Sequence, residues 1–79
     1  MQERKIRLIW DFRGPEALKI AEHHCVHLEE FALKANLDYR PCSVMVSTEL
    51  YSMAFITVNE RDLFVFRDAL KPHRAEVAV

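Results

Sequence analysis

The 79-residue chain has little glycine, proline or cysteine: one, three and two residues. A single glycine excludes the glycine-rich loop that cradles phosphates in many nucleotide-binding proteins. The two cysteines, Cys25 and Cys42, are too few and too separate to indicate a disulfide framework. We therefore expect a protein of the reducing cytoplasm.

Long hydrophobic runs and an excess of either charge are also missing. No apolar stretch is long enough to cross a bilayer, and residues 1–5 lack the apolar core of a secretory signal. Eleven lysines and arginines face twelve acidic residues, which gives a net charge of −1. Nucleic acid and membrane are therefore not expected as partners. Because 51% of the residues are hydrophobic, a disordered chain is excluded as well.

The order of hydrophobic patterns predicts the fold. Period-two alternation indicates strands over residues 5–12, 42–48, 51–58 and 74–79, and helical spacing indicates helices over residues 15–35 and 59–70. The order β-α-β-β-α-β is typical of the ferredoxin-like α+β sandwich, in which two helices cover one face of a four-stranded antiparallel sheet. Residues 1–79 are expected to form one such domain.

Capping residues predict where the helices begin and end. Pro15 suits the first turn of the first helix, and Asn36 tolerates the left-handed conformation that ends it. Asn59, followed by Asp62, resembles an N-cap for the second helix. The β-prone run over residues 63–66 leaves a strand as the alternative, although the cap and the continuation of the pattern favour a helix.

The uncovered face of such a sheet is predicted to carry apolar side chains. The third strand turns outward either Tyr51, Met53 and Phe55 or Ala54, Ile56 and Val58, and Ile9 and Met45 can join the first set. Exposed apolar patches usually mark interaction surfaces, so we expect a homodimer, or a small-molecule or protein ligand, at this face. Scattered surface hydrophobic residues, which are common, are the alternative.

A histidine cluster in the first helix predicts a second kind of site. His23 and His27 stand four residues apart on one helix face and could chelate zinc or another divalent transition metal, with His24 nearby. His73 and Glu30 are further candidate ligands. In the alternative interpretation His23 and His27 are solvated, His24 is a packed histidine and Cys25 is a small core residue.

The junction between the first strand and the first helix is a candidate ligand corner. Free N–H groups at a helix start attract anions, and Arg13 could add a charge beside Asp11 and Gly14. The alternative is a simple turn with a solvated arginine. No catalytic constellation is found, because Cys25 lies within the apolar stripe of the helix and the neighbouring His24 projects in another direction.

Residues 52–58 resemble the second RNA-contact motif of the RNA recognition motif family, whose element order is the same. The resemblance implies that Phe55 occupies a base-stacking position, but Met53 and Ile9 stand where aromatic residues are expected. The element order is also similar to that of ACT-type regulatory domains, which are small dimerising modules. Together these features predict a non-catalytic binding or self-association domain, with a transition-metal-binding protein as the alternative.

Overall fold

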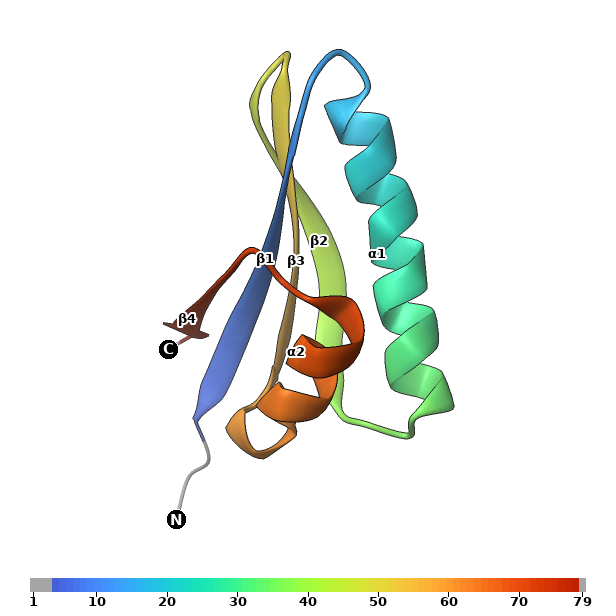
Figure 1. The fold of residues 1–79 in the computed structure, drawn as a ribbon, viewed down its shortest axis with the longest axis vertical. Helices are drawn as coiled ribbons and strands as arrows, with labels where there is room; N and C mark the ends of the chain where they lie inside the picture. Colours follow the sequence, from blue (N-terminus) through green and yellow to red (C-terminus); the bar gives the residue numbers. More distant parts are fainter. Residues whose placement is uncertain (1–3, 79) are drawn as a thin grey trace.

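The computed structural model describes residues 4–78, in which four strands and two helices follow one another in the predicted order (Figure 1). The elements are β1 (Lys5–Arg13), α1 (Ala17–Lys34), β2 (Tyr39–Thr48), β3 (Tyr51–Asn59), a 3-10 turn (Glu60–Asp62), α2 (Leu63–Leu70) and β4 (Arg74–Ala78). The sheet order is β2-β3-β1-β4, and every neighbouring pair is antiparallel. The prediction of an α+β fold with a four-stranded antiparallel sheet and two helices is confirmed. Neither described helix has the length and apolar character needed to span a membrane.

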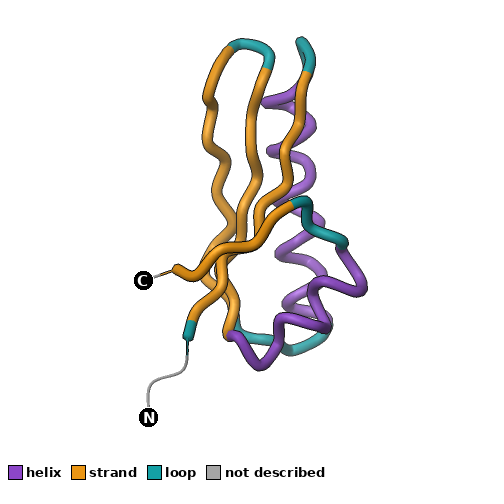
Figure 2. The backbone as a smooth tube through the Cα atoms, turned by 60° about the vertical axis from the view of Figure 1, so that its left-hand side comes forward, coloured by secondary structure: helices purple, strands orange, loops and turns teal. Residues whose placement is uncertain are grey.

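Both helices lie on the same side of the sheet, and the core forms between the two layers (Figure 2). Leu8 and Ile56 from the central strands meet Leu28 of α1 and Phe66 of α2, and all four are fully buried. Trp10 joins this core and donates its indole N–H to the carbonyl oxygen of Leu70, 2.9 Å away. The carbonyls at the end of a helix lack partners within it, so this bond also fixes α2 against β1.

The helix ends agree with the sequence in part. Asn36 has a φ of +57°, as predicted for the residue that ends α1. Asn59 occupies an N-cap position, but that of a 3-10 turn and not of α2; its side chain makes no capping bond and instead accepts a hydrogen bond from Lys5 Nζ. A 3-10 turn therefore precedes α2. The alternative of a strand over residues 63–66 is excluded, since Leu63–Leu70 is α-helical.

Strand β2 begins earlier than predicted. The sequence predicted that this strand starts at Cys42, but Tyr39 and Arg40 already pair with Val58 and Thr57 of β3. Proline is tolerated here because β2 is an edge strand and the register shifts between Arg40 and Ser43. At the other end of the chain, the predicted strand residue Val79 lies outside the described residues, and β4 is described to Ala78.

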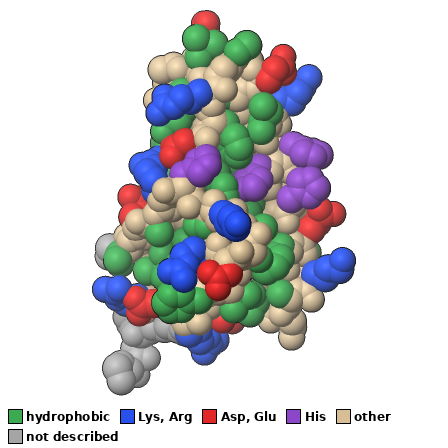
Figure 3. All heavy atoms as spheres, in the orientation of Figure 1, with side chains coloured by type: hydrophobic (Ala, Val, Ile, Leu, Met, Phe, Trp, Pro, Cys, Tyr) green, Lys and Arg blue, Asp and Glu red, His purple; other side chains and the backbone are tan. Residues whose placement is uncertain are grey.

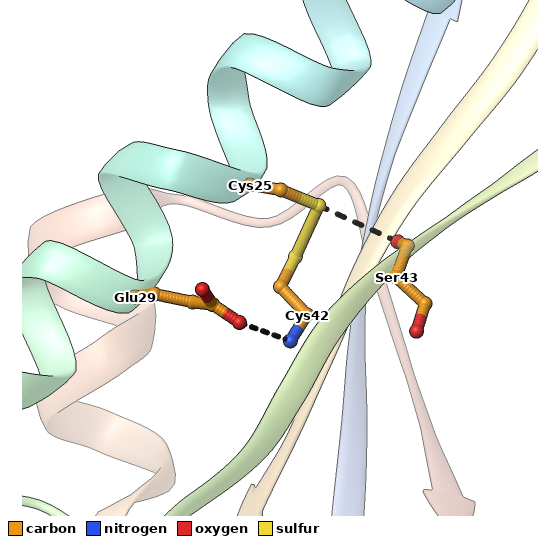
Figure 4. The surroundings of a disulfide bond; sticks show 4 residues. All are labelled: Cys25, Glu29, Cys42 and Ser43. Carbon is orange, nitrogen blue, oxygen red and sulfur yellow. Dashed lines mark hydrogen bonds between the residues drawn. A yellow bond between two sulfur atoms is a disulfide. The ribbon is translucent and has the colours of Figure 1, made fainter.

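A disulfide joins Cys25 of α1 to Cys42 of β2, which the sequence did not predict (Figure 4). The Cα atoms of the two cysteines are 5.5 Å apart, and the bond closes a sequence separation of 17 residues. Glu29, one helical turn after Cys25, accepts the backbone N–H of Cys42 at 2.8 Å. Two links therefore tie the long helix to the edge strand.

The disulfide corrects two sequence interpretations: that the two cysteines are too separate to pair, and that Cys25 is a small core residue. Cys25 is only partly buried and is not simply a small core residue. The spacing of the cysteines gave no sign of pairing because helix and edge strand become neighbours only when the sheet has formed. Disulfides persist mainly in oxidising compartments. The bond therefore does not support the expected cytoplasmic location, which stays a prediction.

Candidate functional site

The open face of the sheet carries the side chains that the helices do not cover. In β3, Ser52, Ala54 and Ile56 are buried beneath the helices. Because side chains alternate along a strand, Tyr51, Met53 and Phe55 point to the open side. The structure thus decides between the two parities that the sequence left open, in favour of the aromatic set.

Five residues define what we call the open-face patch: Ile9, Met45, Tyr51, Met53 and Phe55. Cross-strand pairing places Ile9 opposite Phe55 and Met45 opposite Met53. All except Tyr51 line one hollow of about 120 Å³, together with Arg7, Arg74 and Glu76. Exposure varies across the patch: Ile9 is buried, with 6% of its surface exposed, whereas Met45 is 53% exposed.

Arginine side chains lie over both aromatic rings of this patch. The guanidinium of Arg7 is 5.3 Å from the ring centre of Phe55, and that of Arg13 is 4.1 Å from the ring centre of Tyr51. Arg7 also pairs with Glu76 of β4 at 3.1 Å. A cation over an aromatic face is attracted by the ring quadrupole, so the patch presents flat, positively charged groups to solvent.

Asp11 is the centre of a polar network that the sequence did not predict. Its carboxylate accepts two hydrogen bonds from Arg74, at 2.9 and 3.0 Å, and one from the Tyr51 hydroxyl at 2.5 Å. Its backbone N–H donates to Nδ1 of His73 at 2.8 Å. Only the pairing of β1 with β3 and β4 brings these residues together, so no sequence spacing could have indicated the network.

Hydrogen bonding within this network shifts the affinity of its groups for protons. The bonds from Arg74, followed by that from Tyr51, lower the pKa of Asp11 against the opposing effect of burial. The same carboxylate raises the pKa of the Tyr51 hydroxyl and that of Arg74. Asp11 is therefore held as a carboxylate, which neutralises one arginine of the open face.

The polar groups of the predicted ligand corner contact other residues of the chain. Gly14 has a φ of +113°, and its N–H donates to the carbonyl oxygen of Leu50 at 2.8 Å. Asp11 is bound to Arg74 and Tyr51, and Arg13 lies over the Tyr51 ring. The three predicted residues therefore hold the tip of the β2–β3 hairpin against the end of β1.

Charge on the open face differs in sign from that of the whole chain. Strand register places five cationic side chains and two acidic ones at open-face positions, although the chain as a whole carries −1. The cationic residues are Lys5, Arg7, Arg13, Arg40 and Arg74, and the acidic ones are Asp11 and Glu76. The fold thus separates charges that are mixed along the sequence.

The histidines gather on the face of the molecule shown in Figure 3, and three of them, His23, His24 and His27, belong to α1. His24 packs edge-on against Trp10 and Phe12, with ring centres 5.0 and 5.4 Å away, so it is the packed histidine of the alternative interpretation. Its Nε2 is buried without a partner, and burial, followed by the charges of His27 and His73, lowers its pKa. Exposed His23 and His27 approach each other, with 3.0 Å between their Nε2 atoms.

Three or more metal-ligating side chains do not gather at any place within residues 4–78. The three histidines of the predicted cluster therefore do not form one site, and only His23 and His27 are paired. Comparison with known proteins adds no further assignment: no protein-family model, curated protein or solved structure matches the chain.

Proposed function

We propose that this protein is a non-catalytic binding domain that contacts an anionic macromolecule through the open face of its sheet. The observation that carries the proposal is the excess of cationic side chains around the apolar open-face patch. Positive charge draws a polyanion to the surface, and the apolar centre stabilises the contact once water has been displaced.

We further assign the chain to the ferredoxin-like sandwich. The strand order β2-β3-β1-β4, the antiparallel pairing of all neighbours and the two helices on one side support this assignment. This fold supports many unrelated functions, so the functional proposal depends on the open face and not on the topology.

The size of the hollow and the sign of its charge favour a macromolecular, anionic partner. Small-molecule sites usually enclose about 300–1,000 Å³, whereas this hollow measures about 120 Å³. A second copy placed face to face would bring two surfaces of the same sign together, which is unfavourable. The homodimer expected from the sequence is the alternative that the experiment has to exclude.

The test measures binding of two labelled polyanions, a single-stranded oligonucleotide and poly-glutamate, by fluorescence anisotropy at several salt concentrations. The variant Arg13→Gln/Arg40→Gln removes two cations from the open face. The matched control, Lys19→Gln/Lys34→Gln, removes two exposed cations from α1. We expect the open-face variant alone to lose affinity. For the single-stranded oligonucleotide, its slope of log affinity against log salt should become shallower by about 1.4.

The outcomes of this experiment distinguish the kind of partner and show whether the open face is the binding site. Preference for the oligonucleotide would mean that bases stack on the aromatic rings and guanidinium groups of the patch. Equal binding of the two polymers would mean that the partner is recognised by its charge alone. Equal losses in the two variants would show that the open face is not the site. A dimer in sedimentation that Met53→Arg dissociates, without binding of either polymer, would overturn the anionic partner in favour of a second copy.

A further inference from the structure

We propose that His23 and His27 form a two-imidazole site on α1 for a divalent transition metal ion, with Cu²⁺ and Ni²⁺ favoured over Zn²⁺. This site is separate from the open face and does not depend on the function proposed for that face. It rests on the position of the two Nε2 atoms, which lie 3.0 Å apart on exposed side chains.

That separation suits two nitrogens bound to one ion. With metal–nitrogen bonds of about 2.0–2.1 Å, two ligands at a right angle are about 2.9 Å apart and two ligands at the tetrahedral angle about 3.3–3.4 Å apart. The observed 3.0 Å is closer to the right angle. Square-planar coordination by nitrogen is typical of Cu²⁺ and Ni²⁺, and Cu²⁺ is also bound most strongly by imidazole.

Glu30 adds a second feature that favours metal binding. Its carboxylate lies 3.3 Å from Nδ1 of His27, three residues earlier on the same helix. A carboxylate that accepts a hydrogen bond from Nδ1–H fixes the tautomer and the ring orientation, and so leaves the lone pair of Nε2 available for a metal ion. Glu30 is thus a positioning residue for His27 and not itself a ligand.

Within residues 4–78, a third ligand-type side chain does not join His23 and His27. His24 Nε2 is buried, and Cys25 is held in the disulfide. The ion would therefore keep open positions for water or for ligands from another molecule. Two imidazoles on a helix that is already formed lose little entropy on binding, because α1 holds them four residues apart.

Calorimetric titration of the full chain with Cu²⁺, Ni²⁺, Zn²⁺ and Ca²⁺ tests the proposal. We expect one ion bound per chain, with Cu²⁺ tightest and Ca²⁺ not bound. His23→Ala and His27→Ala should each weaken Cu²⁺ binding at least tenfold, and Glu30→Gln about tenfold. His73→Ala, checked for folding by circular dichroism, is the control and should leave the affinity unchanged.

Electron paramagnetic resonance of the Cu²⁺ complex supplies a readout that is independent of affinity. Nitrogen couplings from two imidazoles are expected in the wild type and from one in His27→Ala. Cu²⁺ affinity that neither histidine substitution changes would overturn the site. So would the absence of binding by Cu²⁺ and Ni²⁺ to the wild type, which would leave a simple hydrogen bond between two exposed histidines.

Discussion

At the scale of single residues, partners from distant strands decide the properties of several side chains. Asp11 could be solvated at the end of a strand, but Arg74 and Tyr51 hold it as a carboxylate. The sequence left open whether His24 joins the other two histidines or packs in the protein, and its edge-on contacts with Trp10 and Phe12 decide for packing. The backbone places these side chains, and their neighbours then set their chemistry.

His24 should make the stability of the fold dependent on pH. Its pKa in the folded state lies below the ordinary value of 6.5, mainly because burial disfavours the charged ring. Between these two pKa values the unfolded chain binds more protons than the folded one, so the free energy of unfolding falls as the pH drops below about 6.5. Above that pH the contribution of His24 is constant.

Urea denaturation of the wild type and of His24→Gln between pH 7.5 and pH 5.5 measures this effect. We expect a smaller loss of stability on acidification in the variant, whatever its stability at pH 7.5. Asp11 does not interfere, because its lowered pKa affects stability only below its ordinary value of 3.8. Identical pH profiles for the two proteins would contradict the prediction.

At the scale of elements, α1 and α2 are attached to the sheet in different ways. The disulfide and the Glu29 bond tie α1 to the edge strand β2. Helix α2 has eight residues and depends on the buried ring of Phe66, 5.5 Å from that of Phe31, and on the Trp10 bond to Leu70. Helices this short are not stable alone, so these tertiary contacts maintain α2.

Removal of the disulfide should destabilise the protein without changing its fold. For a closed loop of this length, chain entropy predicts a loss of about 3 kcal/mol in Cys25→Ser/Cys42→Ser. Urea denaturation of the variant, and of the wild type with and without reductant, measures the loss. Reductant should lower the stability of the wild type and leave the variant unaffected. Two free thiols in protein purified without reductant would contradict the bond.

Two phenylalanines of α2 offer a matched comparison. Phe66 is fully buried, and Phe66→Ala should lower the free energy of unfolding by about 3–5 kcal/mol through the cavity it leaves. Phe64 is 59% exposed and contacts Arg67, so Phe64→Ala should cost less than about 1 kcal/mol. Equal losses by chemical denaturation would mean that α2 does not dock through Phe66.

At the scale of the whole molecule, one core connects all the layers. It joins β1, β3, α1 and α2, while β4 lies at the edge and is largely exposed. A single shared core is typical of cooperative, two-state unfolding. The same arrangement leaves the far side of the sheet uncovered, and that is where the separated positive charge appears.

Trp10, the one tryptophan of the chain, can report on this cooperativity. Its indole is buried and bonded to the last residue of α2, so its fluorescence depends on the docking of that helix. We expect urea transitions followed by tryptophan fluorescence and by far-ultraviolet circular dichroism to coincide. A fluorescence transition at lower urea would mean that α2 detaches before the sheet and α1 unfold.

The sequence alone determined the order of strands and helices, because hydrophobic periodicity is a local property that each segment carries within itself. It also indicated the left-handed residue Asn36 and the residues of the open-face patch as one of two alternatives. Tertiary structure decided the rest: the outward parity of Tyr51 and Phe55, the Cys25–Cys42 bond, the early start of β2 and the network around Asp11. Each of these depends on which strands and helices become neighbours, and residues far apart in the chain acquire that relation only through packing of the common core.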